Sequence, residues 1–367
     1  MSTFVEAGTH YQSNLTKPQG VRNTSYKAAL AEACAIEMRR DPSVVLYGLD
    51  VTDHKRIFGT TEGLLEEFGA SRVFHTPLSE DAMTGAGMGM ALNGLRPIHI
   101  HIRADFLLLG MNQIANMLSS YRYMSGGNFK VPMVIRAVIG RGWGQGAQHS
   151  KSMQSVFAHF PGIKVIMPTT PADAKGLLSS AIRDDNPVIS LEHRWLFEAV
   201  DHVPEGEYTV PIGEPAVMRE GSDITLVTSS WMTVEALEAA RILHERAGVS
   251  CEVVDVRTVA PLNMDPIFES VAKTKRAIVA DNDWVYCGFG SELAASVMEN
   301  CWDALSMPVK RIGFAPSPCP ATRPLENHFY PNAAQIIHQV TQSLDIDPID
   351  LSGDEFYSWT KRFKGPF

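Results

Sequence analysis

The sequence lacks an excess of basic charge. Its 367 residues carry 32 Lys plus Arg against 41 Asp plus Glu, which gives a formal net charge of −9. Proteins that bind nucleic acid through its phosphates need a surplus of Lys and Arg, so the composition argues against a nucleic-acid partner. At roughly 100–200 residues per domain, the length predicts two domains, each able to bury its own core.

Cysteines and long apolar runs are also scarce. The five cysteines include no C-x-x-C pair, which argues against a disulfide scaffold or a Cys-type zinc site and favours reduced thiols in a cytoplasmic protein. Crossing a bilayer takes about 20 apolar residues, and the longest candidate run, 106–118, is interrupted by Asn112, Gln113 and Asn116. The N-terminus has no apolar signal core. We therefore expect no membrane partner and no export signal.

Several common catalytic motifs are missing as well. The glycine-rich run 85–89 is not G-x-G-x-x-G in any frame, so it argues against a dinucleotide cradle and favours a helix with Gly85 and Gly89 on one face. No G-x-S-x-G, H-E-x-x-H or P-loop occurs. Gly-Asp-Gly followed by a downstream Asn is also absent.

Apolar runs typical of buried strands alternate with stretches of helical periodicity. Before residue 200, the pattern predicts helices over 26–40, 62–68, 82–95, 106–120 and 172–182, and strands over 44–49, 72–74, 97–102, 131–138, 164–167 and 188–191. A second alternation follows, with strands over 224–228, 251–256, 277–280 and 309–312, and helices over 233–247, 265–273 and 291–300. This order predicts an α/β fold with two doubly wound parallel-sheet domains.

The composition also suggests where the domains begin and end. A stretch rich in Pro and Gly, 201–221, reads as a linker. We expect an N-terminal arm over 1–24, a first domain over 25–200, a second domain over 222–345 and a tail over 346–367.

Glu80 is the most informative carboxylate. It follows a predicted strand end and precedes the uncharged stretch 82–95. Open α/β sheets place ligands at the carboxyl ends of their strands. Burial among apolar neighbours would raise the pKa of such a carboxyl and suit it to share a proton. The alternative is a helix N-terminal Glu that the helix dipole stabilises, and the spacing leaves both interpretations open.

His99 and His101 alternate along a predicted strand and so point to one face of the sheet. Two histidines at this spacing can ligate a metal, but no nearby carboxylate or cysteine completes a ligand set. The pattern therefore favours a polar pocket wall or a subunit contact.

Four stretches carry a more specific pattern. They are residues 72–98 (RVFHTPLSEDAMTGAGMGMALNGLRPI), 104–127 (ADFLLLGMNQIANMLSSYRYMSGG), 146–152 (GAQHSKS) and 159–189. In this order they resemble the beta subunits of thiamine-diphosphate-dependent 2-oxo-acid dehydrogenases of the pyruvate and branched-chain type. The resemblance implies a transketolase-like pyrimidine-binding domain followed by a domain of the transketolase C-terminal type.

The resemblance also implies site residues. Glu80 matches the family glutamate that hydrogen-bonds the aminopyrimidine ring, and Leu78 lies where a backbone carbonyl meets the pyrimidine amino group. Phe106 matches the aromatic residue that packs on this ring, and Ile102 replaces a Gln or Met near the cofactor. His149 matches the family histidine near the reacting carbon, so Glu80 and His149 are the expected catalytic residues.

Two further sets of residues follow from the same comparison. In some members, the positions of Ala181, Ile182, Asp184 and Asn186 bind a structural potassium ion; the alternative here is a polar turn. Departures from the family pattern that would lie near the substrate are His101, Arg103, Arg141 and His193. Extra Arg and His could bind a phosphate or a polyhydroxy chain, whereas the alternative is drift on loop surfaces.

The missing Gly-Asp-Gly and Asn pattern fits this resemblance, because in the superfamily it holds the cofactor diphosphate through a divalent metal. The chain would then carry only the pyrimidine half of the site. An alpha-type subunit would supply the diphosphate half and most magnesium ligands in an alpha2beta2 heterotetramer, to which a lipoyl acyltransferase could dock. The expected reaction is decarboxylation of a 2-oxo acid with transfer of the acyl unit. The alternatives are a split transketolase-like subunit that moves a two-carbon ketol unit between sugars, and a non-catalytic scaffold.

Overall fold

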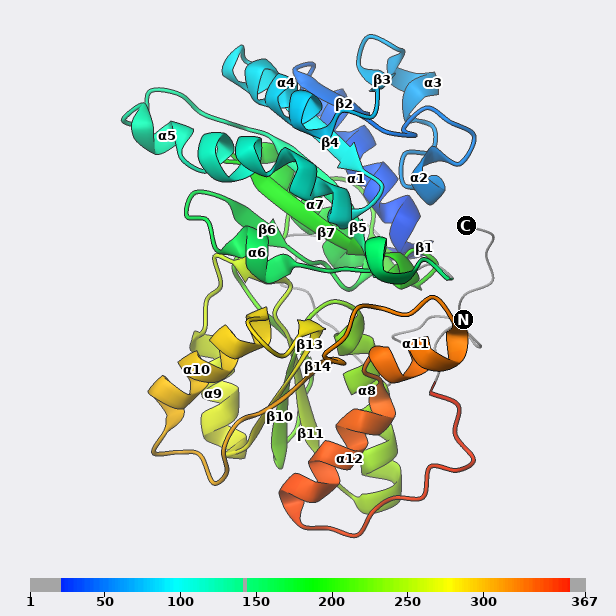
Figure 1. Ribbon diagram of the computed structural model, residues 1–367, viewed down its shortest axis with the longest axis vertical. Helices are drawn as coiled ribbons and strands as arrows, with labels where there is room; N and C mark the ends of the chain where they lie inside the picture. Colours follow the sequence, from blue (N-terminus) through cyan, green and yellow to red (C-terminus); the bar gives the residue numbers. More distant parts are fainter. Residues whose placement is uncertain (1–20, 141–143, 357–367) are drawn as a thin grey trace.

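The computed structural model describes residues 21–140 and 144–356. Two layered α/β units lie one above the other, and the first half of the chain forms the upper unit in Figure 1. Each unit has its own sheet with helices on both faces, which confirms the predicted fold class.

The first unit is built on a seven-stranded sheet in the order β12-β6-β7-β5-β4-β2-β3. Its strands are β2 (Val44–Gly48), β3 (Val73–His75), β4 (Arg96–His101), β5 (Val134–Ile139), β6 (Lys164–Ile166), β7 (Val188–His193) and β12 (Thr258–Ala260). All neighbours pair in parallel except β12, which comes from the second half of the chain and runs antiparallel to β6. The second half of the chain thus completes the edge of the first sheet.

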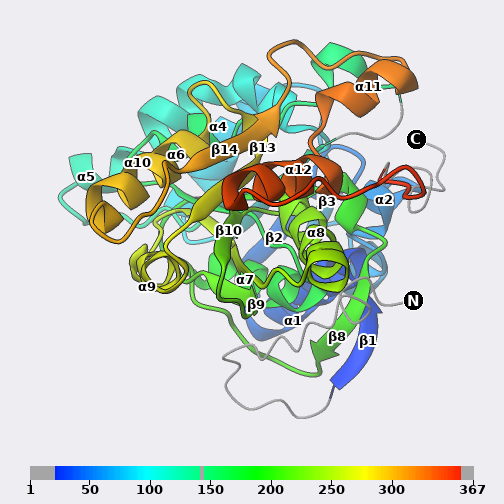
Figure 2. The same ribbon diagram turned by 90° about the horizontal axis from the view of Figure 1, so that it is seen from below.

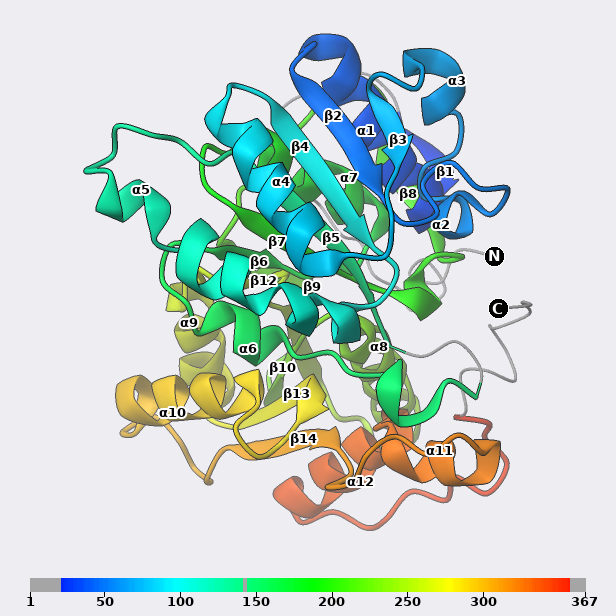
Figure 3. The same cartoon turned by 45° about the horizontal axis from the view of Figure 1, so that its top comes forward.

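Helices cover both faces of this sheet (Figure 3). One face carries α1 (Tyr26–Arg40) and α7 (Pro171–Arg183), which pack against each other. The other face carries α4 (Glu80–Leu92), the 3-10 helix η1 (Ala104–Gly110) and the π-helix η2 (Asn112–Leu118). Shorter helices are α2 (Arg56–Gly59), α3 (Leu64–Phe68), α5 (Tyr121–Met124), η3 (Gly146–Gln148), α6 (Gln154–Ala158) and η4 (Arg194–Leu196).

The second unit has a five-stranded sheet in the order β14-β13-β10-β11-β9. Its strands are β9 (Ala216–Arg219), β10 (Ile224–Thr228), β11 (Cys251–Asp255), β13 (Ala277–Trp284) and β14 (Lys310–Phe314), and only β9 is antiparallel to its neighbour. The helices are α8 (Trp231–Ala247), α9 (Asp265–Thr274), α10 (Phe289–Cys301), α11 (Arg323–Phe329) and α12 (Ala333–Leu344). Helices α8 and α12 pack together on one side of the sheet, and α9 and α10 pack together on the other (Figure 1).

The ends of the first unit differ from the sequence expectation. β1 (Val21–Ser25) begins within the predicted arm, and it pairs antiparallel with β8 (Val200–Pro204), so the two strands run side by side (Figure 2). Most of β8 and all of β9 lie within 201–221, the predicted linker. The Pro and Gly content of that stretch argued against strands there. Two short strands form nevertheless, because pairing with the distant β1 and β11 overrides the local preference.

Two other observations bear on the sequence expectations. All five cysteines lie in the described residues, and each is a free thiol. Within the described residues, no helix combines the length and the apolar character required to cross a bilayer.

Candidate functional site

Phe106 and His149 meet at the carboxyl ends of the strands of the first sheet. Phe106 belongs to η1, which follows β4, and His149 directly follows η3. Their ring centroids are 5.2 Å apart in an edge-to-face arrangement at 72°. Both side chains are half-buried, so each keeps an accessible surface. Two of the residues expected at the site therefore contact each other.

An ion pair that the sequence analysis missed fastens these two segments together. Lys151 Nζ donates to Asp105 Oδ1 at 3.0 Å and to the carbonyl oxygen of Ala147 at 2.8 Å. The Asp105 carboxylate is buried beside Phe106 in the chain, whereas Lys151 is about one-third exposed. The sequence did hold a signal for this pair, because a lysine stands two residues after His149 and an aspartate stands directly before Phe106. The pair holds the loop of His149 against η1.

Glu80 is the first residue of α4 and is half-buried. Its backbone oxygen accepts a hydrogen bond from Thr84 Oγ1 at 2.7 Å. A Cβ on Gly110 would lie 3.0 Å from Thr84 Oγ1 and 3.4 Å from the Glu80 oxygen, so the end of η1 packs directly on the first turn of α4. Glu80 is thus a helix N-terminal glutamate, as one of the two interpretations expected. This position is compatible with a ligand at the same carboxylate.

The remaining expected cofactor residues lie nearby in the chain. Leu78 stands in the bend before α4 with a side chain that is 77 % exposed. Ile102 follows β4 and packs, half-buried, against the core between the sheet and α1. A carboxylate, an accessible main chain, an aromatic ring and an imidazole suit an aminopyrimidine, which offers a ring nitrogen, an amino donor and a flat face. These residues therefore fit the pyrimidine half of thiamine diphosphate.

The two histidines of β4 are buried in contact with each other. The rings of His99 and His101 are 4.2 Å apart, and His99 stacks on Tyr47 at 4.5 Å. Both histidines are 2 % exposed. Burial lowers the pKa of His101 to about 4, so the ring is neutral near pH 7. In the described part of the chain, no group of three or more His, Cys, Asp or Glu side chains could hold a metal.

Arg103 is a buried cation at the end of the same strand. It is 3 % exposed, and its Nη1 donates to the carbonyl oxygen of Gly140 at 3.0 Å. Burial and the Arg194 guanidinium lower the pKa of Arg103 to about 10. The arginine thus stays charged near pH 7 at a considerable cost in solvation.

His193 ends β7 and is 1 % exposed. Its ring stacks on Trp231 of the second unit at 5.8 Å and 20°. Gly140 has a φ of +71°, and a Cβ there would lie 2.4 Å from His193 Nε2, so only glycine allows this packing. Three residues expected to contact substrate, His101, Arg103 and His193, are therefore buried in the isolated chain. The fourth, Arg141, lies outside the described residues.

The loop expected to bind potassium contains Ala181, Ile182, Asp184 and Asn186. Arg96 Nη1 donates to the carbonyl oxygens of Ile182 at 3.1 Å and Asp184 at 3.0 Å. The Asp184 carboxylate pairs with Lys164 and accepts from Asn186 Nδ2 at 2.8 Å. Protein donors already engage these oxygens, although a carbonyl oxygen has two lone pairs and can accept a second partner. Potassium at this loop stays a prediction.

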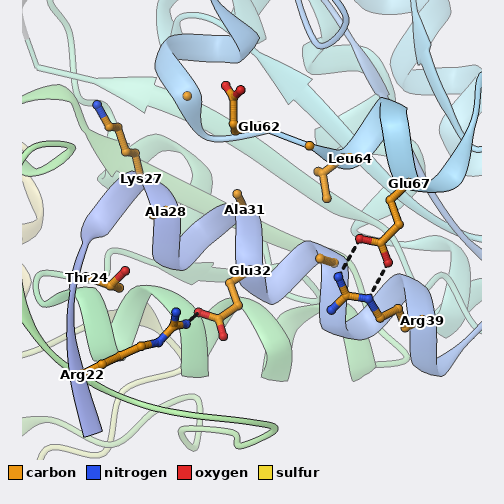
Figure 4. Close-up of a pocket in the computed structure, with 13 residues that line it drawn as sticks. Arg22, Thr24, Lys27, Ala28, Ala31, Glu32, Arg39, Glu62, Leu64 and Glu67 are labelled. Carbon is orange, nitrogen blue, oxygen red and sulfur yellow. Dashed lines mark hydrogen bonds and ion pairs between the residues drawn. The ribbon is translucent and has the colours of Figure 1, made fainter.

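An open cavity of about 610 Å³ lies away from these residues, between α1 and the segment 59–67 (Figure 4). Its floor includes Ala28, Ala31 and Leu64. On its rim, Arg39 Nη2 donates to Glu67 Oε2 at 2.6 Å, and Arg22 pairs with Glu32. None of the expected site residues lines it, so we place the candidate site at Glu80, Phe106 and His149.

Comparisons with known proteins identify two family domains in this chain. The family description "Transketolase, pyrimidine binding domain" matches residues 22–198, and "Transketolase, C-terminal domain" matches residues 213–336.

Curated relatives match most of the chain. The acetoin:2,6-dichlorophenolindophenol oxidoreductase subunit beta of Cupriavidus necator is 41 % identical over 325 residues, covering 86 % of this chain and 96 % of the relative. The 2-oxoisovalerate dehydrogenase subunit beta of Bacillus subtilis is 40 % identical, with coverages of 85 % and 96 %. The pyruvate dehydrogenase E1 component subunit beta of Rickettsia felis is 38 % identical, with coverages of 86 % and 96 %.

A solved structure described as "Split gene transketolase, inactive beta4 tetramer" is also similar. It superposes with a TM-score of 0.70 and covers 88 % of this chain and 98 % of its own. Because the sequence identity is 22 %, this likeness shows the fold alone.

Proposed function

Because this chain belongs to the family of beta subunits of thiamine-diphosphate-dependent 2-oxo-acid and acetoin dehydrogenases, we propose that it supplies the pyrimidine side of an active site shared with an alpha-type subunit. The observation that carries this proposal is the contact of Phe106 with His149, beside the first turn of α4, where Glu80 begins the helix. All three residues stand at the carboxyl edge of the sheet, where α/β proteins bind ligands.

Each residue has a proposed role. The Glu80 carboxyl shares a proton with a pyrimidine ring nitrogen, the Leu78 carbonyl accepts from the amino group, and Phe106 packs on the ring face. The His149 imidazole donates a proton to the substrate oxygen or accepts one from it. Bound thiamine diphosphate supplies the carbon nucleophile and the electron sink for decarboxylation. The Lys151 to Asp105 ion pair holds His149 and Phe106 in this arrangement.

The partner proposals rest on the sequence and on the surface around the site. The relatives are named as beta subunits, which implies an alpha-type partner. Leu78, Leu108 and Leu109 are exposed near the site at 77 %, 41 % and 61 %, as expected of a surface that a partner covers. We propose an alpha2beta2 assembly in the cytoplasm, in which the alpha subunit holds the diphosphate and most of the magnesium ligands, with a lipoyl acyltransferase as acyl acceptor.

The test uses Glu80→Gln, which keeps the side-chain shape but removes the proton-sharing carboxyl. The full chain is mixed with a candidate alpha-type subunit, and 2-oxo-acid decarboxylation and thiamine diphosphate binding are measured. We expect turnover to fall by about 10²-fold or more. Glu299→Gln, an exposed position on α10, is the control and should keep full turnover. Full turnover by Glu80→Gln would instead support the scaffold alternative.

Ketol transfer between sugars is the second candidate. The charged arginines Arg103 and Arg194 lie buried at the carboxyl edge of the first sheet, and their long-range field favours the two negative charges of a sugar phosphate over the single charge of a 2-oxo acid. The two reactions differ in the acceptor. Acyl transfer to lipoamide supports the dehydrogenase, whereas transfer of a two-carbon unit to an aldose phosphate supports the transketolase-like enzyme.

A further inference from the structure

The segment that follows His149 is anchored in the second unit by two buried carboxyl groups. Helix α6 lies between the first sheet and the region of β13 and α10 (Figure 3). Gln154 Nε2 donates to Asp281 Oδ1 at 2.9 Å, and Ser155 Oγ donates to Asp283 Oδ2 at 3.0 Å. Gln154 is fully buried, and both aspartates are 4 % exposed. Shortly after His149, the chain is thus bonded to β13.

The hydrogen bonds of Asp281 are uneven. Its Oδ1 accepts from Gln154 Nε2, from the Ser229 hydroxyl and from the Asn282 N–H at 2.8 Å. Within the described residues, Asp281 Oδ2 and Gln154 Oε1 are buried and have no hydrogen-bond partner. Each group thus leaves one of its two polar atoms without a hydrogen bond of normal geometry, although the Gly290 N–H also faces the Asp281 carboxyl. A buried polar atom left in this state costs about 1–3 kcal/mol.

A single proton on Asp281 would give each of these two atoms a partner. A protonated carboxyl group donates through one oxygen and accepts through the other, and a primary amide likewise offers one donor nitrogen and one acceptor oxygen. The two groups can therefore form a ring of two hydrogen bonds, of which Nε2–H to Oδ1 is present. We propose that Asp281 carries a proton on Oδ2 in the folded protein, that this proton is donated to Gln154 Oε1, and that the acid–amide pair positions the loop of His149.

The neighbouring groups agree with this assignment. Both oxygens of Asp283 face donors, because Oδ1 accepts from the Trp284 N–H at 2.8 Å and Oδ2 accepts from Ser155. Burial raises the pKa of both carboxyl groups, that of Asp283 to about 7 with the Asp281 charge adding to the rise, so the pair readily keeps one proton. The unpartnered Oδ2 assigns this proton to Asp281, because both oxygens of Asp283 already accept hydrogen bonds. The groups that face Asp281 are Asp283 and the uncharged Ser229, Gln154, Asn282 N–H and Gly290 N–H.

The proton itself is tested by infrared spectroscopy of the full chain with ¹³C-labelled aspartate at pH 7. A neutral carboxyl has a C=O stretching band that an ionised one lacks. Asp281→Asn is expected to remove a component of this band, and Asp283→Asn is expected to leave that component in place. If Asp281→Asn removes no neutral-carboxyl intensity, Asp281 is ionised and a water or a cation fills its place, which overturns the proposal.

The positioning role is tested with a matched pair of variants. Asn at 281 presents an acceptor oxygen and a donor nitrogen where the protonated acid has them, whereas Ala presents neither. By hydrogen exchange of peptides within 144–156, we expect Asp281→Ala to exchange at least about tenfold faster than wild type and Asp281→Asn to stay near wild type. Equal loss of protection in both variants would mean that the carboxylate form is required.

The pH dependence gives a third measurement that needs no turnover. The pKa of Asp281 is raised in the folded state, so the folded chain keeps a proton that the unfolded chain releases. As pH rises from the pKa of Asp281 in the unfolded chain toward its pKa in the folded chain, the folding equilibrium constant of wild type should fall by up to about tenfold per pH unit relative to Asp281→Asn. Parallel curves would overturn the proposal.

The catalytic role of His149 rests on the proposed function, but the protonation of Asp281 and its hold on the loop do not. If Glu80→Gln keeps full turnover while the infrared and exchange results hold, the proposed function fails and the acid–amide pair stands.

Discussion

Arg136 and Glu192 form an ion pair inside the first unit, and removing one partner should destabilise the fold strongly. Arg136 lies on β5 and Glu192 on the neighbouring β7, with side chains 1 % and 2 % exposed. Two parallel hydrogen bonds join them, from Nε to Oε1 at 2.7 Å and from Nη2 to Oε2 at 2.9 Å. Breaking a buried pair leaves one charge without its partner, which costs about 3–5 kcal/mol. We expect this loss for Glu192→Gln, which keeps the shape but removes the charge.

The assay is urea unfolding of the full chain, followed by circular dichroism. The exposed variant Glu299→Gln should change the free energy of unfolding by less than about 0.5 kcal/mol. Replacing both partners with apolar residues, as Arg136→Met with Glu192→Leu, should be much less harmful than either single change, because a buried pair barely repays its own desolvation. A loss below about 1 kcal/mol for Glu192→Gln would refute the reasoning. A double variant less stable than both single variants would refute it too.

Three further predictions concern the site and its surroundings. Gly140→Ala should lower the free energy of unfolding by at least about 2 kcal/mol, because the left-handed φ of +71° disfavours alanine and the new Cβ would meet His193. The control is Gly127→Ala, at φ +80° with no atom within 4 Å of the new Cβ, which should show only the smaller loss due to the unfavourable φ in the same unfolding assay. Burial lowers the pKa of both His99 and His101, so stability should fall as pH drops below their unfolded value near 6.5; His101, with a pKa of about 4, contributes about 3 kcal/mol, and His101→Phe should remove that part and leave the part due to His99. If the loop at Asn186 binds potassium, the melting temperature should be higher in potassium chloride than in sodium chloride and Asn186→Ala should abolish the difference; equal melting temperatures for wild type would refute the site.

Local periodicity was enough to predict most helices and strands. The helix over 26–40 matches α1 in both bounds, because Ser25 caps its start and Pro42 follows its end. The strand over 224–228 matches β10. The family resemblance carried by 72–98 and the three later stretches is confirmed by relatives of about 40 % identity.

Long-range contacts set the limits of prediction. One α-helix was predicted over 106–120, but the structure has the 3-10 helix η1 and the π-helix η2, because Gly110 is held against the first turn of α4. The strand β12 joins the sheet of the first unit although it lies beyond β11 of the second, which no local pattern reveals. Helices α11 and α12 were not predicted at all.

The same limit applies to the candidate site. The alternation of His99 and His101 correctly placed both rings on one face, and in the structure their centroids lie 4.2 Å apart with the rings tilted by 58°. Departures from the family pattern suggested that Arg103 and His193 lie near the substrate. In the isolated chain both are buried, since Gly140 admits the His193 ring, Trp231 of the second unit stacks on that ring, and Arg103 donates to the Gly140 carbonyl. The residue types alone indicated an unusually polar region around Arg103 and His193. Its burial could not be predicted, because it depends on contacts with residues far along the chain, such as Trp231.

The second unit holds the loop of His149, which belongs to the candidate site of the first unit. The candidate site lies wholly on the first unit, yet the loop of His149 is bonded to the second at several points. The Tyr330 hydroxyl donates to the Ser150 carbonyl at 3.4 Å, and Gln154 donates to Asp281. A loop has few local interactions to hold it, so contacts with a separate rigid sheet restrict the His149 side chain, for which we propose a role in proton transfer. A change confined to the second unit should therefore alter the position of His149 without touching any residue of the site.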